Sequence, residues 1–133
     1  MTTPDPLAPA PNPAPGFRRK PDHAITVTPH AGRVVVRSGD RVLAATDAAL
    51  ELVEAGYPPV LYIPFADIDF APLARSATMT HCPFKGDATY WLVGLPGDAG
   101  EDVMWAYETP YDETAAIRDH GAFYPDRVTI ETT

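Results

Sequence analysis

Alternation of apolar and polar side chains is the dominant pattern along the chain, and it predicts a domain made mostly of β-strands. Short runs rich in β-branched and aromatic residues recur, separated by proline, glycine and aspartate. The predicted strands cover residues 25–28, 33–37, 41–45, 60–63, 78–82, 88–95, 103–107, 123–124 and 128–130. Turns at 38–40, 96–100 and 125–126 are expected to join neighbouring strands into hairpins. About eight short strands of this kind are typical of a β-sandwich or a small barrel-like sheet pair.

One segment has instead the pattern of a short α-helix. Thr46 or Asp47 is a suitable N-cap, and Leu50 and Val53 would form a buried stripe. Gly56 stands where a helix often ends in a left-handed residue. The sequence therefore predicts one short helix between the cap and Gly56, in an otherwise mainly β fold.

The beginning of the chain is rich in proline and poor in large apolar side chains. Seven of the sixteen prolines fall within the first 22 residues. Such a segment cannot bury enough surface to offset the entropy lost on ordering. We expect residues 1–21 to form a disordered tail, partly in polyproline II conformation, and residues 22–133 to form a single domain.

The charge of the chain argues against two classes of partner. The net charge is −8, and three of the ten cations are adjacent, at Arg18, Arg19 and Lys20. Binding to nucleic acid or to an anionic membrane depends on a cationic surface, so both partners are disfavoured.

Cysteine and histidine content limits the chemistry further. Cys82 is the only cysteine, which excludes an intrachain disulfide and a cysteine-rich zinc site. The four histidines show no metal-ligand spacing, and no apolar stretch is long enough for a signal sequence or a membrane span. We expect a cytoplasmic protein without a metal or cofactor.

Strand parity separates two groups of aromatic residues in the hairpin of residues 88–107. If the hairpin pairs symmetrically about its loop, Tyr90 lies opposite Tyr107 and Leu92 lies opposite Trp105. Tyr90, Trp105 and Tyr107 then share one face. The other face carries Trp91, Met104 and Ala106. Parity alone leaves open which face belongs to the core and which to a pocket.

The densest group of reactive side chains lies in residues 80–87, which read Thr-His-Cys-Pro-Phe-Lys-Gly-Asp. A turn here could bring Lys85 near Cys82, and a nearby cation favours the nucleophilic thiolate. His81 would point away from Cys82 on a strand, so a Cys–His dyad within this segment is disfavoured. The alternative is a buried, inert cysteine with Lys85 ion-paired at the surface.

Two further acidic positions have a possible chemical role. Asp67 and Asp69 have the spacing of a magnesium-binding pair, although a solvated loop gives the same pattern. Glu54 would sit at the end of the predicted helix, where a negative charge is unfavourable, and is interpreted as a solvated acid.

Several dispersed segments resemble the domain of unknown function family 427 over most of the chain, from about His23 to Glu131. The most specific is Cys-Pro-Phe-Lys-Gly at 82–86. The remaining segments are His-Ala-Ile at 23–25, Arg-Val-Val-Val at 33–36, Glu-Ala-Gly-Tyr-Pro-Pro-Val-Leu-Tyr-Ile-Pro at 54–64, Trp-Ala-Tyr-Glu-Thr-Pro at 105–110 and Gly-Ala-Phe-Tyr-Pro-Asp-Arg-Val at 121–128.

The resemblance implies a compact β-tent-like fold, similar to that of methionine-R-sulfoxide reductases and Yippee-type domains. Those relatives hold zinc with paired Cys-x-x-Cys motifs, which this chain lacks, so a zinc site is not carried over. The family is sometimes filed under a nucleotidyltransferase-like name, but a Gly-Ser phosphate-binding pair is missing here. The residues that match the family pattern are Glu54, Tyr62, Asp67, Thr80, Cys82, Lys85, Gly86, Tyr90, Trp105, Tyr107 and Phe123.

Together these observations predict one pocket that binds a small molecule. Its expected aromatic walls are Tyr62, Tyr90, Trp105 and Tyr107, with Glu54 and Thr80 as further ligand-binding residues. The expected polar groups, which would be the catalytic residues of an enzyme, are Cys82, Lys85 and Asp67. In an enzyme, Lys85 would stabilise negative charge or activate Cys82, and Asp67 would orient the ligand or accept a proton. The alternatives are a non-catalytic module with an aromatic cage, a structural subunit of an assembly, and nucleotidyltransferase-like activity.

Overall fold

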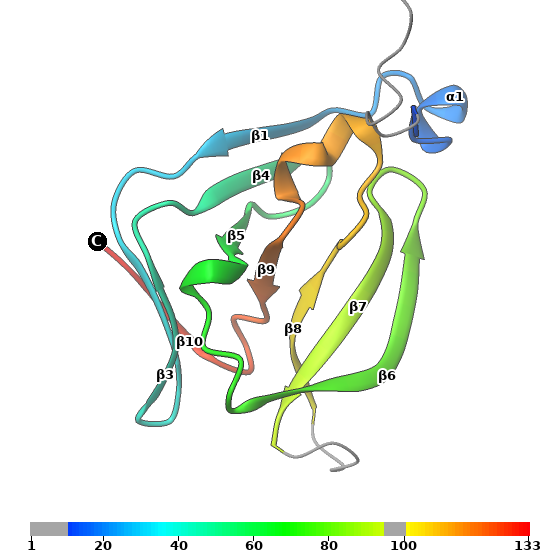
Figure 1. Cartoon of the computed structure of the whole chain (residues 1–133). Helices are drawn as coiled ribbons and strands as arrows, with labels where there is room; N and C mark the ends of the chain where they lie inside the picture. Colours follow the sequence, from blue (N-terminus) through cyan, green and yellow to red (C-terminus); the bar gives the residue numbers. More distant parts are fainter. Residues whose placement is uncertain (1–10, 95–100) are drawn as a thin grey trace, which may run out of the picture.

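The structure, a computed structural model, describes residues 11–94 and 101–133, and its fold is mainly β (Figure 1). Within these ranges ten antiparallel strands form two sheets, and the helical segments are short turns. The strands are β1 (Ile25–Pro29), β2 (Val34–Ser38), β3 (Arg41–Thr46), β4 (Leu50–Glu54), β5 (Val60–Pro64), β6 (Leu73–Cys82), β7 (Gly86–Val93), β8 (Asp102–Ala106), β9 (His120–Phe123) and β10 (Thr129–Thr132). The helical turns are α1 (Gly16–Arg19) and the 3₁₀ segments η1 (Phe65–Asp67) and η2 (Asp112–Ile117).

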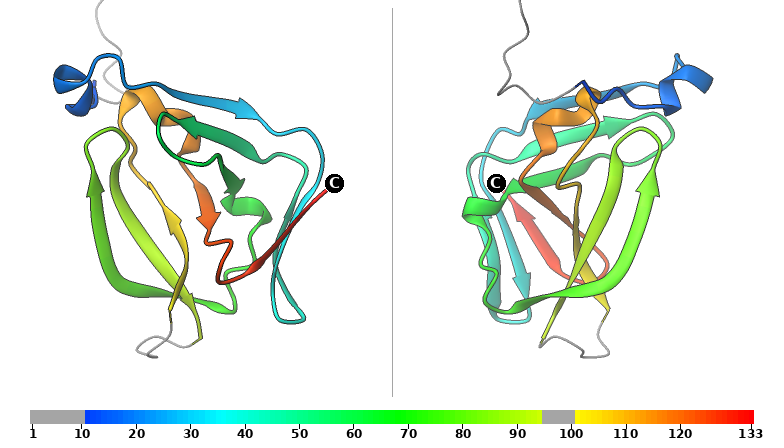
Figure 2. Two further views of the ribbon diagram at one scale, coloured as in Figure 1. Left: turned by 180° about the vertical axis from the view of Figure 1, so that it is seen from behind. Right: turned by 45° about the vertical axis from the view of Figure 1, so that its right-hand side comes forward.

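The larger sheet has seven strands and is strongly curved. Its strand order is β1-β4-β5-β9-β8-β7-β6, and the smaller sheet has the order β10-β2-β3. In Figure 1, β1 and β4 run across the view while β7 and β8 run down it, and Figure 2 shows the same bend from behind. The 3₁₀ segment η2 lies near the top of this bend. The large sheet therefore forms a concave surface.

Each face of the large sheet belongs to a different apolar cluster, because successive side chains on a strand point to opposite faces. Ile63, Trp91 and Met104 pack with Val34 and Leu43 of the small sheet in the main core. The residues on the opposite face form the second cluster, which includes Leu52, Tyr62, Ala88, Tyr107, Ile117 and Ala122. The second cluster covers the face that does not contact the small sheet.

The helix expected before Gly56 is wrong, because Leu50–Glu54 forms strand β4. The spacing of Leu50 and Val53 fits a helix, but Leu52 is buried while Val53 is 40% exposed. Leu52 pairs with Val27 of β1 and with Val60 of β5, so β4 is hydrogen-bonded on both sides. Pairing with two neighbours outweighs the weak local preference of this segment for a helix.

The hairpin expected at the end of the chain is also wrong, whereas the one around residues 38–40 is confirmed by the pairing of β2 with β3. β9 pairs with β5 and β8, and β10 pairs with β2 in the other sheet. The amides of Arg127 and Val128 both donate to the Tyr124 carbonyl. This tight turn after Pro125 carries the chain from one sheet to the other.

Strands β7 and β8 pair antiparallel, as expected, but in a different register. Tyr90 lies opposite Trp105 rather than Tyr107, and Leu92 lies opposite Asp102 after a bulge. The offset is two positions, which keeps the parity of the side chains. Tyr90 and Trp105 therefore still share the expected face, and Trp91 and Met104 share the other. The connecting loop at 96–100 lies outside the described residues.

Residues 11–21 differ from the disordered tail expected from their composition. Ala14 is buried, and the Gly16 amide donates to the Pro83 carbonyl. Phe17 packs edge-on against Phe84, with ring centroids 5.0 Å apart. These contacts hold the one-turn helix α1 on the turn between β6 and β7, which composition alone does not reveal. Residues 1–10 of the expected tail lie outside the described part of the chain.

Among the described residues there is no helix both long and apolar enough to span a membrane.

Candidate functional site

The candidate site is a hollow of about 300 Å³ on the concave face of the large sheet, here called the aromatic hollow. This face belongs to the second apolar cluster, so the hollow lies away from the small sheet. Its lining residues are Leu52, Glu54, Tyr57, Pro58, Val60, Tyr62, Cys82, Lys85, Tyr90, Trp105, Tyr107 and Tyr124. A few polar groups among aromatic walls are the composition of a small-molecule site.

Strand parity explains why these side chains meet. Leu52 and Glu54 are two residues apart on β4, as are Val60 and Tyr62 on β5, so each pair points to one face. Tyr90 and Trp105 are register partners on β7 and β8. Curvature of the sheet then turns these strands toward one another across the concave face (Figure 1).

At one end of the hollow, a buried carboxylate joins two basic side chains. Lys85 Nζ donates to Glu54 Oε1 at 2.7 Å, and His23 Nε2 lies 2.8 Å from Glu54 Oε2. The side chains of Glu54, Lys85 and His23 are 9%, 13% and 14% exposed. Each carboxylate oxygen thus has its own hydrogen-bond partner. The sequence suggested that Glu54 is a solvated acid at the end of a helix. Both expectations are wrong, because Glu54 lies on strand β4 and is buried.

The pKa of Glu54 lies below its ordinary value. Burial disfavours the charged form, but hydrogen bonds with Lys85 and His23 and the positive charge of Lys85 outweigh that effect. Glu54 is therefore ionised at neutral pH. The carboxylate balances the Lys85 ammonium, so this end of the hollow carries little net charge despite its two ions.

Two buried tyrosines of the hollow, Tyr62 and Tyr107, carry neutral hydroxyl groups. Burial raises the pKa of Tyr62 and Tyr107 well above the usual value, and nearby acidic groups add to the effect. Lys85 Nζ lies 5.5 Å from the Tyr107 ring centroid, in a cation–π contact. Trp105 and Tyr124 have centroids 4.6 Å apart. The walls therefore offer flat apolar surface with hydroxyl groups at the margins.

The turn between β6 and β7 places both Cys82 and Lys85 at the hollow. Cys82 ends β6 and pairs with Gly86, which begins β7, so three residues form the loop. Gly86 has a φ of +117°, and a Cβ there would lie 3.3 Å from the Thr109 carbonyl oxygen. Only glycine readily fits this backbone conformation. The Cys-Pro-Phe-Lys-Gly segment is therefore a tight turn with a required glycine, and it places Lys85 within hydrogen-bond distance of Glu54.

The structure brings most of the predicted site residues together but leaves out two. Glu54, Tyr62, Cys82, Lys85, Tyr90, Trp105 and Tyr107 all line the aromatic hollow. Thr80 is exposed beside it, and its hydroxyl is 2.7 Å from the Tyr90 hydroxyl. Asp67 is not a lining residue, since it is exposed in η1 and accepts a hydrogen bond from Thr46 Oγ1 at 2.6 Å. Asp67 is thus separated from the group with which it was predicted.

Several residues of the site were not predicted. His23 is the most important, because it bonds to Glu54 from a segment that composition assigns to the edge of the tail. Leu52 was assigned to a helix, which hid its parity with Glu54. The other missed lining residues are Tyr57, Pro58, Val60 and Tyr124. The Tyr-Pro-Pro motif at 57–59 was visible, but nothing in the sequence directed it to the aromatic strands.

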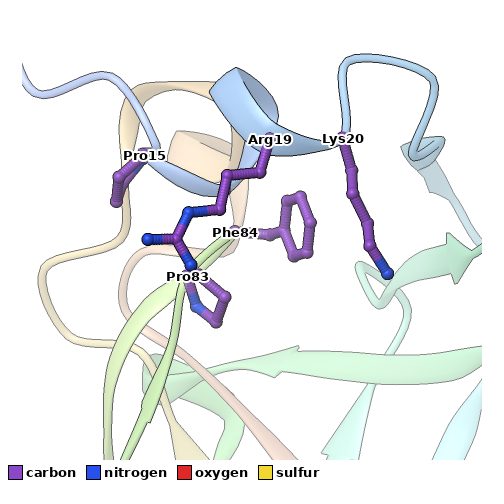
Figure 3. A pocket seen from close by; sticks show the side chains of 6 residues that line it. Pro15, Arg19, Lys20, Pro83 and Phe84 are labelled. Atoms are coloured by element: carbon purple, nitrogen blue, oxygen red, sulfur yellow. The ribbon is translucent and has the colours of Figure 1, made fainter.

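A second hollow, of about 430 Å³, lies between α1 and the turn that follows β6, and is called the basic hollow. Figure 3 shows the Phe84 ring between the side chains of Arg19 and Lys20. The walls also include Pro15, Gly16 and Pro83. Both cations are exposed, and the hollow lacks a buried polar group of the kind that Glu54 supplies to the aromatic hollow. The aromatic hollow is therefore the stronger candidate.

A third hollow, of about 400 Å³, adjoins the aromatic hollow and is called the apolar groove. The two share Tyr57, Pro58, Val60 and Trp105. Further along, the apolar groove is lined by Pro59, Leu61, Phe123, Pro125 and Ile130.

Within residues 11–94 and 101–133, no group of three or more His, Cys, Asp or Glu side chains is arranged to hold a metal ion. Asp67 bonds to Thr46, and Asp69 pairs with Arg41 at 3.1 Å. The two carboxylates of the Asp-x-Asp pair thus interact with different side chains.

Comparison with known proteins places the chain in a family. No curated protein matches the sequence. Residues 26–133 match the model of a family described as a domain of unknown function (DUF427), whose short name denotes a nucleotidyltransferase. This range includes all twelve residues that line the aromatic hollow, and it excludes α1 and His23. The chain belongs to the family described as domain of unknown function (DUF427).

Proposed function

We propose that the domain binds a small, planar organic molecule in the aromatic hollow, with an oxygen acceptor of the ligand facing Lys85. The observation that carries the proposal is the buried Glu54–Lys85 pair at the end of a hollow walled by five tyrosines and a tryptophan. Lys85 lines this hollow, and an ammonium has three hydrogen-bond donors, one of which is used by Glu54 Oε1. A carboxylate, amide or ketone oxygen would suit the others.

The charges in the hollow favour a neutral or anionic ligand over a cationic one. An aromatic cage for a cation needs open ring faces and a negative field. Here the Lys85 ammonium already lies over the Tyr107 ring, and the Glu54 carboxylate is neutralised by its partners. A second cation would be repelled by Lys85. The aromatic walls therefore support stacking of a planar neutral or anionic group.

Three probes of equal size test the ligand class. Benzoate, benzamide and benzylamine present an anion, a neutral acceptor and a cation on the same ring. We expect benzoate and benzamide to shift the resonances of the Trp105 indole and of Lys85 in an NMR titration, and benzylamine to leave them unchanged. Binding by benzylamine alone would contradict the proposal and favour the cationic cage.

A pair of aromatic variants locates the binding. Trp105→Ala removes a wall of the aromatic hollow, and we expect it to abolish binding. Phe65→Ala is the matched control, because Phe65 packs on the opposite face of the sheet with Phe70 and Trp91. Both variants are first checked for a cooperative unfolding transition. Equal loss of affinity in the two variants would show that binding does not depend on the aromatic hollow.

A thiol-dependent reaction is the second candidate function, since Cys82 and Lys85 line the same hollow. In that case the Cys82 thiolate would add to a carbonyl carbon of the bound ligand, the C=O π electrons would move to the oxygen, and Lys85 would stabilise the resulting oxyanion. Cys82→Ser separates the two functions. Binding without turnover in both the original chain and the variant supports binding alone. Turnover by the original chain that the variant loses, at unchanged affinity, supports catalysis.

Nucleotidyl transfer has less support from the arrangement of the acidic residues. The two carboxylates of the Asp-x-Asp pair bond to Thr46 and Arg41, outside the lining of the aromatic hollow. Equilibrium dialysis with ATP and magnesium tests this activity directly. Saturable binding of ATP that depends on Asp67 would restore it as the leading function.

A further inference from the structure

The apolar groove lies beside the aromatic hollow, and the two share part of their walls. Four residues line both, and Trp105 stands at the junction. The two spaces differ in chemistry. The aromatic hollow contains Glu54, Lys85 and Cys82, whereas the lining of the apolar groove has no charged side chain.

The apolar groove exists because two neighbouring strands separate. β5 pairs with β9 from Pro64 as far as Tyr62, which lies opposite Ala122. Beyond that point, Val60 and Leu61 pair only with β4, since the chain after Phe123 turns toward β10. Three prolines of this region lack the amide needed to extend the ladder. Those prolines are Pro58, Pro59 and Pro125.

From this adjacency and the contrast in chemistry we propose that the ligand of the aromatic hollow is amphipathic, with an apolar arm that lies in the apolar groove. The inference rests on the proposed function, because the planar head group would occupy the aromatic hollow and its acceptor would face Lys85. The arm passes Trp105 and contacts Leu61 and Ile130. The groove, of about 400 Å³, and the hollow, of about 300 Å³, are each large enough for a small-molecule group, so side by side they suit a ligand larger than one ring.

Burial of an alkyl arm predicts a graded gain in affinity. The test uses benzoate and its 4-ethyl, 4-butyl and 4-hexyl derivatives, titrated below their aggregation concentrations into the full chain. Each buried methylene contributes about 0.8 kcal/mol, which lowers Kd by about threefold to fourfold. We expect the gain to continue until the groove is filled and then to stop. 4-Butylbenzylamine, with the same arm but a cationic head, is expected to bind much more weakly than 4-butylbenzoate.

A matched pair of variants places the arm. Ile130→Ser adds a hydroxyl to the wall of the apolar groove and should remove most of the gain from the butyl chain, with the affinity for benzoate unchanged. Val42→Ser, on β3 of the same small sheet, is the control because Val42 is exposed and lines neither space. It should bind the whole series like the unmodified chain.

The outcomes separate the two proposals. Binding of benzoate without any gain from the alkyl arm overturns the amphipathic ligand and leaves the proposed function standing. If Ile130→Ser keeps the gain in affinity from the alkyl arm, the placement of the arm in the apolar groove is overturned. Occupation of the groove by a second copy of the chain, which sedimentation would detect, would overturn it as well. If neither benzoate nor its derivatives bind, the proposed function itself fails.

Discussion

Removing the carboxylate of Glu54 should destabilise the fold strongly, and removing its partner as well should restore much of the loss. Glu54→Met leaves the Lys85 ammonium, 13% exposed, without its carboxylate. Breaking a buried ion pair in this way typically costs about 3–5 kcal/mol of unfolding free energy, because an uncompensated charge stays buried. The double variant, Glu54→Met with Lys85→Met, replaces both ions with apolar side chains of similar length. Its stability should lie within about 1–2 kcal/mol of the original.

The assay is urea denaturation at pH 7, followed by tryptophan fluorescence, for the four members of this double-mutant cycle. The expected coupling energy exceeds about 2 kcal/mol, since the pair is in hydrogen-bond contact at 2.7 Å. Asp47→Asn is the surface control. Arg33 and Asp47 are 52% and 74% exposed, so the loss of their pair should cost less than about 1 kcal/mol. Additive single effects, or a loss for Glu54→Met no larger than for Asp47→Asn, would refute the buried-pair argument.

Three further predictions follow from the same region. The pKa of Glu54 is lowered from the ordinary 4.5, so the stability that its carboxylate contributes should be present above about pH 4.5 and be lost as the pH falls through the pKa of the folded state. The difference in unfolding free energy between the original chain and Glu54→Gln should therefore shrink in acid. A difference that stays constant with pH would contradict this prediction. His23→Ala leaves Glu54 Oε2 without its partner and should cost about 1–3 kcal/mol in a urea titration, whereas a cost near zero would mean that water replaces the imidazole. Gly86→Ala should cost about 1–3 kcal/mol of unfolding free energy because the φ of Gly86 is +117°. Gly39→Asn is the control and should cost much less, because Gly39 has a φ of +57° and open space around it. Equal costs for the two variants would refute the argument from backbone strain.

Parity made the site largely predictable from the sequence. Tyr90 and Trp105 were placed on one face although their register was wrong, since an offset of two positions changes the partner of a strand residue but not its direction. The concentration of reactive side chains in the Cys-Pro-Phe-Lys-Gly segment pointed to the turn between β6 and β7. The mainly β fold followed from recurring short alternating runs, and the family assignment is confirmed over residues 26–133.

The errors share a physical cause, which is that long-range pairing decides what local pattern cannot. The spacing of Leu50 and Val53 fits a helix, but the segment forms a strand because it pairs with β1 on one side and β5 on the other. Asp67 was assigned to the pocket because it matches the family pattern and has the spacing of a magnesium-binding pair with Asp69, yet the 3₁₀ turn directs it toward Thr46. His23 lies in a segment that resembles the family, but nothing in the sequence linked it to Glu54, which is 31 positions away.

The position of His23 outside the family match has a practical consequence for comparing relatives. An alignment cut at residue 26 would retain Glu54 and Lys85 but lose the imidazole that completes the set. Homologues compared only within that window would then look alike at the carboxylate even where this third member differs. Sequence surveys of the family should therefore begin upstream of the matched range and ask whether histidine, the aromatic Phe17 and the glutamate vary together.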